Sequence, residues 1–368
     1  MKKNARIVKI SGLNPNGLPL CALLSQVLVA FTIELDNEFE REMPHRTTNH
    51  GGSRHDPWLV SMVMWQNCMR WIDKDGLRIA ELAALAKTLT NLNGMQRWGY
   101  IDIEPGPAKK RIIRPTAAGE RAQKIWKPLF AAIEKRWQTR FGEDLILRLR
   151  DALGQVTEEL DLELPDCLPI VAYGLFSKGT DQKPRTKPFL RKHERLTLDA
   201  LVARVLLAFA IEFEREAKLS LAISANVIRV LGEKGVLVAD LPALSGVAMN
   251  LVSVGLNYSS SRGFVVVEAD PAGGRRKVAR LTPPGLKAQQ YYDKRMVAIE
   301  VDWKERFGED TIWGLRRVLE ALVGEPAASP LLSCLGTYPE GWRGSLPKLN
   351  RLPHFPVVTH RGGFPDGS

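Results

Sequence analysis

The chain carries the same pattern of sequence blocks twice. Residues 18–34 read LPLCALLSQVLVAFTIE, and residues 196–212 read LTLDALVARVLLAFAIE. The two segments align without a gap and share ten identical positions. Further along, residues 114–119 (RPTAAG) match residues 280–285 (RLTPPG) in the same order. Ordered blocks of this kind indicate an internal duplication, so a fold of two similar units is expected.

Two further matches extend the repeat. Residues 137–144 (WQTRFGED) correspond to residues 303–310 (WKERFGED), and a weaker match pairs the segment around Cys167 with that around Cys334. In each half an acidic pair follows the FG step, which predicts a helix break and a new helix start. A chain of 368 residues is long enough for two such units.

Each unit is predicted to open with a long buried helix. Apolar residues fill most positions from Leu20 to Phe31, so this helix is expected to be covered on more than one side. A second apolar helical stretch is predicted over residues 58–72 in the first half and over residues 225–231 in the second.

A pair of short helices then follows in each half, as in a helix-turn-helix. Residues 79–86 (IAELAALA) and 239–245 (ADLPALS) carry small and apolar residues at helical spacing, which is typical of the first helix. The second, recognition helix is predicted over residues 88–97 and 248–260. Such a helix enters the major groove, where Asn, Gln and Arg read base edges. The candidate base-reading side chains are Thr88, Thr90, Asn91, Asn93, Gln96, Arg97, Asn250, Ser253, Asn257, Ser259, Ser260 and Arg262.

Some of these candidates have an ordinary structural alternative. Asn and Ser also cap helices and fill turns, and about half of these side chains are expected to do only that. The second recognition helix is poor in charge, so the two halves are not expected to read the same sequence with equal strength.

A basic hairpin, or wing, is predicted after each recognition helix. Strands are expected at residues 98–104 and 262–268, each followed by a Pro/Gly-rich tip and a basic return strand. Basic residues at a protruding tip contact phosphates or enter the minor groove. In one hairpin they would more simply shield a sheet edge, but two copies behind two helix-turn-helix candidates favour DNA contact. The candidate wing residues, equally spaced in both halves, are Lys109, Lys110, Arg111, Arg114, Arg275, Arg276, Lys277 and Arg280.

The net charge agrees with a polyanionic partner. The chain has 52 Lys and Arg residues against 41 Asp and Glu residues, which gives a net charge of +11. DNA is the first candidate for such a partner, RNA the second and an anionic membrane the third.

The order of elements resembles the MarR family of bacterial regulators. Both Arg-x-Thr-x-x-Gly stretches, at residues 114–119 and 280–285, are similar to the end of that family's wing, and the resemblance covers residues 18–153 and 196–322. It implies a mainly α fold with small β-wings (α+β). MarR proteins are usually dimers joined by their first and last helices. The resemblance therefore implies two tandem winged helix-turn-helix repeats that share a helical pseudo-dimer core.

The resemblance also implies a function. It implies a transcriptional regulator that binds a pseudo-palindromic site on double-stranded DNA and is relieved by a small-molecule effector. The chain would act as a monomeric pseudo-dimer or self-associate further. Two alternatives stay open. One is a plasmid-type replication initiator, and the other is an interaction or ligand-sensing module that does not bind DNA.

The chain is expected to divide into five segments. These are an N-terminal arm (1–17), a first repeat (18–160), a linker (161–195), a second repeat (196–323) and a Gly/Pro-rich C-terminal extension (324–368). The linker is rich in Pro, Lys and Arg and is interpreted as a solvated strap. The extension includes apolar residues, which predict that it docks on the rest of the chain: Phe355, Val357, Val358 and Phe364.

Catalytic, cofactor and metal sites are not predicted. No Walker A, GxGxxG, GxSxG or HExxH motif occurs, so the chain is not expected to be an enzyme. The spacing of Cys334, His354, His360 and Asp366 matches no standard metal site. No apolar run was expected to be long enough for a membrane span and no signal peptide is recognised, so a cytoplasmic protein without a membrane partner is expected.

Overall fold

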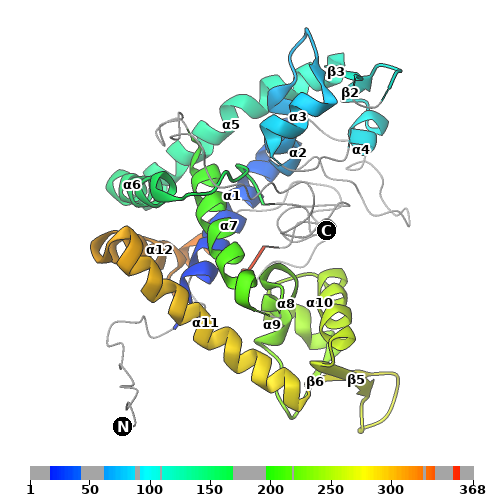
Figure 1. Cartoon of the computed structure of the whole chain (residues 1–368), viewed down its shortest axis with the longest axis vertical. Coiled ribbons are helices and arrows are strands. Elements are labelled where there is room, and N and C mark those ends of the chain that lie inside the picture. Colours follow the sequence, from blue (N-terminus) through cyan, green and yellow to red (C-terminus); the bar gives the residue numbers. More distant parts are fainter. Residues whose placement is uncertain are drawn as a thin grey trace.

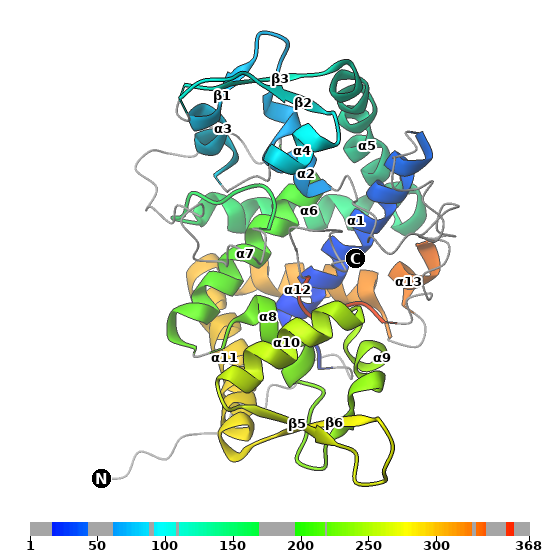
Figure 2. The ribbon, with the colours of Figure 1, turned by 90° about the vertical axis from the view of Figure 1, so that its right-hand side faces the viewer.

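The fold is known from a computed structural model. It describes residues 17–42, 62–87, 92–107, 110–168, 196–217, 219–325, 329–335 and 351–356. The protein is mainly helical and carries two small three-stranded antiparallel sheets near opposite ends of an elongated molecule (Figures 1 and 2). The α+β class expected from the sequence is therefore confirmed.

The first half forms one set of helices and one sheet. Its elements in chain order are α1 (Leu20–Glu42), α2 (Met62–Asn67), the 3-10 turn η1 (Met69–Trp71), β1 (Leu77–Arg78), α3 (Ile79–Ala86), α4 (Leu92–Arg97), β2 (Ile101–Ile103), β3 (Ile112–Pro115), α5 (Ala117–Phe141) and α6 (Glu143–Glu159). The predicted break in the RFGED segment is present, because Gly142 (φ 101°) ends α5 and Glu143 and Asp144 begin α6.

The second half contains a comparable series. Its elements are α7 (Leu198–Glu216), α8 (Leu221–Ile228), β4 (Val236–Leu237), η4 (Val238–Asp240), α9 (Leu241–Ser245), α10 (Met249–Ser261), β5 (Val265–Ala269), β6 (Lys277–Leu281), α11 (Pro283–Phe307), α12 (Glu309–Val323) and α13 (Pro330–Cys334). Gly308 (φ 89°) separates α11 from α12 in the way that Gly142 separates α5 from α6.

Several predicted boundaries need correction. The apolar stretch expected at residues 225–231 is α8, which begins four residues earlier and ends at Ile228. In the first half that stretch is divided between α2 and η1, and its residues 58–61 lie outside the described part of the chain. Helix α4 begins at Leu92, and residues 88–91 of the predicted recognition helix are likewise not described.

The core is built around two central helices. α1 and α7 cross in the middle of the molecule, and α6 and α12 pack beside them (Figure 1). Residues 20–37 of α1 are all buried, as its apolar sequence predicted. A helix covered on every side in this way joins the two halves, because it contacts α5 of its own half and α7 and α12 of the other.

The expectation that no apolar run is long enough to cross a bilayer is wrong. Leu20–Phe39 is long and apolar enough to cross a bilayer, and the bent pair Val238–Ser245 and Met249–Ser261 passes the same test when taken together. The whole apolar window of Leu20–Phe39 is buried inside the molecule, which is also how the central helix of a core behaves. In the sequence, Thr32 and the flanking acids break up the apolar run. In the structure Thr32 is buried and donates a hydrogen bond to the Leu28 carbonyl at 2.8 Å, so it does not interrupt the helix.

Each sheet has one strand more than the predicted two-stranded wing. β1 pairs with β3 through Leu77 and Ile113, and β4 pairs with β6 through Val236 and Ala279. The strand orders are β1-β3-β2 and β4-β6-β5. Strands of two residues have no alternating pattern to recognise, so they follow from pairing with the returning strand and not from their own sequence.

The same contacts close the sheet onto the long helix in both halves. The Thr116 hydroxyl donates to the Gly99 carbonyl and accepts the Gly119 N–H at 3.0 Å. In the second half the Thr282 hydroxyl donates to the Gly263 carbonyl and accepts the Gly285 N–H at 3.1 Å. Each threonine therefore caps its helix and ties it to the turn before the second strand.

The long helices are also anchored to the central helices by equivalent contacts. The Trp137 indole donates to Glu34 at 3.0 Å, and the Trp303 indole donates to Glu212 at 2.7 Å. The two tryptophan rings also meet Phe31 and Phe209 edge to face, with ring centroids 5.5 and 5.2 Å apart. These contacts fix the direction in which α5 and α11 carry the sheets outward.

Candidate nucleic-acid interface

Helices α4 and α10 lie on the same side of the molecule. In Figure 1 both are on the right-hand side, and in Figure 2, where that side faces the viewer, one lies above the centre and the other below it. α10 is held in place by close packing on α8, because a Cβ on Gly255 would lie 2.8 Å from a Val227 methyl carbon. The two helices are thus presented in one direction by a shared core.

The described part of α4 has one polar exposed face. Asn93, Gln96 and Arg97 are exposed, whereas Gly94 and Met95 are buried against the rest of the first half. The predicted contacts Thr88, Thr90 and Asn91 lie outside the described residues. The exposed side chains are an amide pair and a cation, which are groups suited to base edges and phosphates.

Most of the predicted α10 residues are exposed, and one is not. The exposed residues are Asn250, Ser253, Asn257, Ser260 and Arg262. Ser259 is 0 % exposed, so it faces the interior and its prediction as a DNA contact is wrong. In a run of serines the apolar stripe is too weak to show which of them points inward.

Local contacts hold two of these α10 side chains. The Arg262 guanidinium carbon lies 3.9 Å from the centre of the Tyr258 ring. The Ser253 hydroxyl donates to the Met249 carbonyl at 2.9 Å, which is the usual alternative for a serine in a helix. Arg262 is therefore held at the end of α10 next to the wing.

The tip of the second wing is strongly basic and open to solvent. Arg275, Arg276 and Lys277 are all exposed, and Arg276 forms an ion pair with Asp270 at 2.9 Å. In the first wing Lys110 is exposed, and Lys109 lies outside the described residues. The structure therefore places the basic tips at the two ends of the molecule, on the sheets that flank α4 and α10.

The remaining wing arginines lie at the base of the sheets. Arg114 pairs with Glu104 across the strands at 3.0 Å, and Arg280 pairs with Glu268 at 2.7 Å. The hydrogen bond from Arg280 lowers the pKa of the Glu268 carboxyl. Arg111 is half-buried. The charges of Arg114 and Arg280 are thus partly balanced within the sheet.

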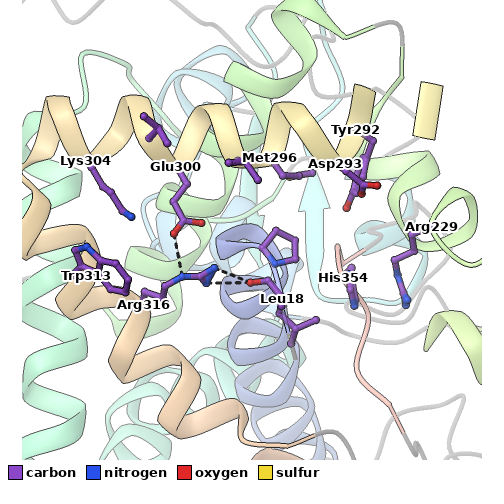
Figure 3. Close-up of a pocket in the computed structure, with 14 residues that line it drawn as sticks. Leu18, Arg229, Tyr292, Asp293, Met296, Glu300, Lys304, Trp313, Arg316 and His354 are labelled. Carbon is purple, nitrogen blue, oxygen red and sulfur yellow. Dashed lines mark hydrogen bonds and ion pairs between the residues drawn. The ribbon is translucent and has the colours of Figure 1, made fainter. Parts of the chain in front are cut away.

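Sequence reasoning missed two features of this region. Met249 and Val254 on α10 are 42 % and 40 % exposed. A cavity beside α11 that contains Arg229 was also not predicted (Figure 3).

No known protein family matches the sequence, and comparison with curated proteins finds no significant match.

Proposed function

We propose that the chain is a DNA-binding regulator in which two winged helix-turn-helix units share one helical core. The closing threonine and glycine of each sheet, and the tryptophan anchors of each long helix, recur in both halves and support a duplicated unit. In this proposal α4 and α10 are the recognition helices, and the sheets with tips at residues 104–111 and 270–276 are the wings. The family resemblance adds a small-molecule effector.

One observation carries the proposal. Two hairpins with exposed basic side chains stand at opposite ends of the molecule, and the helices beside them face the same way (Figures 1 and 2). A duplex lying along that side would meet both helices and both wings. Contacts between cations and phosphates release counterions, so such binding weakens steeply with salt.

A second function is favoured by the surface of α10. Met249 and Val254 are exposed there, and the described helix carries no charged side chain between its ends. Exposed apolar side chains without charged neighbours on the same helix favour contact with another protein over contact with phosphates. In this alternative the first unit contacts DNA and the second binds a partner, or neither contacts DNA.

Selection of duplexes from a random-sequence library tests the proposal. The full chain is compared with a first-wing variant (Lys110→Ala, Arg111→Ala) and a second-wing variant (Arg275→Ala, Arg276→Ala, Lys277→Ala). A matched control removes Arg148 and Arg317, exposed arginines of α6 and α12, which lie away from α4 and α10 in Figure 1.

We expect a two-part motif and loss of affinity in each wing variant, with the control unchanged. The second-wing variant loses three cations. If each contacts a phosphate, the slope of log K against log salt should become shallower by roughly 2.7. A selected motif at promoters supports a regulator, whereas a motif at replication origins supports a replication initiator. If no duplex is enriched at moderate salt, DNA binding is refuted and the interaction module is the remaining function.

A further inference from the structure

The two proposed recognition helices end in the same turn, which aligns them residue by residue. After α4 the Gly99 N–H donates to the Gln96 carbonyl at 2.9 Å. After α10 the Gly263 N–H donates to the Ser260 carbonyl, also at 2.9 Å. The two glycines have similar positive φ angles, 77° and 70°, and the carbonyl of each accepts the hydroxyl of a capping threonine. Gln96 and Ser260 therefore occupy equivalent positions.

The burial of the two helix ends agrees with this alignment. Met95 and Ser259, one position earlier, are both buried, and their carbonyls accept the N–H that leads into the following strand, at 3.1 and 2.9 Å. Two positions further back, Asn93 of α4 corresponds to Asn257 of α10, and both are exposed. The same carboxamide side chain thus stands at the same place on both helices.

Asn257 is the polar group of α10 that is free to contact a ligand in the middle of the exposed face. Its side chain makes no hydrogen bond with the described part of the chain, whereas the hydroxyls of Ser253 and Ser261 donate to carbonyls of the helix itself at 2.9 and 2.8 Å. The exposed positions recur at helical spacing and form one face. They are Met249, Asn250, Ser253, Val254, Asn257, Ser260 and Ser261.

An exposed carboxamide has one preferred base in the major groove. Its oxygen accepts a hydrogen bond from adenine N6 and its nitrogen donates to adenine N7, and no other base offers this pair of groups. Because α4 and α10 carry the carboxamide at the same position and face the same way (Figure 2), both helices are suited to read an adenine at the same place in their half-sites.

The two helices diverge one turn beyond this asparagine. In α4 the residue is Arg97, which is exposed, and arginine pairs through two hydrogen bonds with guanine O6 and N7. In α10 the equivalent residue is Ser261, whose short side chain already bonds to the Tyr258 carbonyl. The sequence of α10 contains no charged residue from Met249 to Ser261. A guanine at this place is therefore suited to α4 and not to α10.

We propose that α4 and α10 read two unequal half-sites of one duplex. Asn93 and Asn257 each pair with an adenine at the same place, and Arg97 pairs with a guanine that has no counterpart in the half-site of α10. This inference rests on the proposed function and adds the bases that are read. Since the two reading helices of one chain differ, the site has only partial two-fold symmetry and the chain binds it in one orientation.

Base preferences of the full chain and of three single variants test this assignment on duplexes selected from a random library. Asn257→Ala should lose the preference for adenine in one half-site, and Arg97→Ala should lose the preference for guanine in the other, each by at least about fivefold in affinity. Ser261→Arg should create a preference for guanine in the half-site of α10 and so make the two half-sites alike. All three residues are exposed, so the variants should keep the native fold.

A base analogue identifies the atom that is read. Replacing the adenine of the second half-site by 7-deazaadenine removes the N7 acceptor, which should weaken binding of the native chain and leave binding of Asn257→Ala unchanged. Ser253→Ala is the matched control on the same face of α10, because its hydroxyl is already bonded to the Met249 carbonyl. It should keep the native affinity and the native base preferences.

Three results overturn the inference. These are a selected site whose half-sites both require the guanine, a Ser261→Arg chain that gains no guanine preference, and an Asn257→Ala chain with unchanged base preferences. The last result favours contact of α10 with another protein through Met249 and Val254. An enriched duplex with other bases removes only this inference, whereas a library without any enriched duplex removes the proposed function as well.

Discussion

At the scale of single residues, the two closing glycines show why both sheets meet their helices in the same way. A Cβ on Gly119 would lie 2.1 Å from the Tyr100 carbonyl oxygen, and one on Gly285 would lie 1.9 Å from the Phe264 oxygen. The capping threonine holds the helix start against this carbonyl. Only a residue without a side chain permits that approach.

We therefore predict that Gly119→Ala destabilises the protein. The obstructing atom belongs to the backbone, so the sheet must shift, and a loss of about 2 kcal/mol or more is expected. Chemical denaturation measures it. Gly314→Ala is the control, because nothing lies within 4 Å of its added carbon, and it should be neutral or stabilising. Equal stability of Gly119→Ala and the native chain would contradict the tight closure.

A second prediction at this scale concerns pH. Burial raises the pKa of Asp199 to about 6, although Gln66 donates to it at 2.7 Å. The folded state holds the proton of Asp199 more strongly than the unfolded chain does. The protonated carboxyl therefore favours the folded state at low pH, and this contribution to the free energy of unfolding is lost as pH rises through about 6. Asp199→Asn should remove roughly 1 kcal/mol of the stability difference between pH 5 and pH 8.

Denaturation curves at the two pH values compare the native chain with Asp199→Asn. The exposed Asp144 provides a matched control, and Asp144→Asn should leave the native pH dependence in place. A native pH dependence that persists in Asp199→Asn would mean that other groups, and not this carboxyl, cause it.

At the scale of elements, a short segment near the end of the chain binds the second half to the core. The Asn226 amide donates to the Phe355 carbonyl at 2.6 Å, and its oxygen accepts the His354 and Phe355 N–H groups at 2.8 and 3.2 Å. Ser25 of α1 donates to the Pro353 carbonyl at 2.9 Å. One buried side chain of α8 thus satisfies three backbone groups of this segment.

Asn226→Ala is predicted to release the segment. The lost bonds leave buried backbone groups unsatisfied, at about 1–3 kcal/mol for each group. Hydrogen exchange should show the amides of His354 and Phe355 exchanging at least about tenfold faster. Ser25→Ala removes one bond and should have a smaller effect, and unchanged exchange in Asn226→Ala would show that the segment is held by other contacts.

The sequence predicted those elements whose signals are local. The RFGED breaks follow from a glycine before two acids, and α3 has the predicted bounds, since Glu81 accepts the Arg78 N–H at 3.1 Å at its start. Docking of the C-terminal extension is confirmed at Phe355, which is 1 % exposed; Val357, Val358 and Phe364 lie outside the described residues.

Other features depend on partners far along the chain. β1 and β4 exist only because β3 and β6 return beside them. The inward direction of Ser259 depends on the packing of α10 against α8 and β5. No local pattern contains this information.

At the scale of the whole molecule, one core carries both sheets and sets the distance between them. α1 and α7 cross at the centre, and α6 and α12 pack together, with Thr311 donating to Gln155 at 3.0 Å. Because α5 and α11 extend from this core in opposite directions (Figures 1 and 2), a change at the core would alter the separation of the two proposed recognition helices.

The most direct test of the proposed regulator is hydroxyl-radical footprinting on a selected duplex, with the stoichiometry measured in parallel. We expect one chain per duplex and two protected zones on one side of the DNA. The Lys110→Ala, Arg111→Ala variant should lose one zone, and the Arg275→Ala, Arg276→Ala, Lys277→Ala variant should lose the other. A single zone, or two zones that require two chains, would contradict the claim that both units of one chain bind the same duplex.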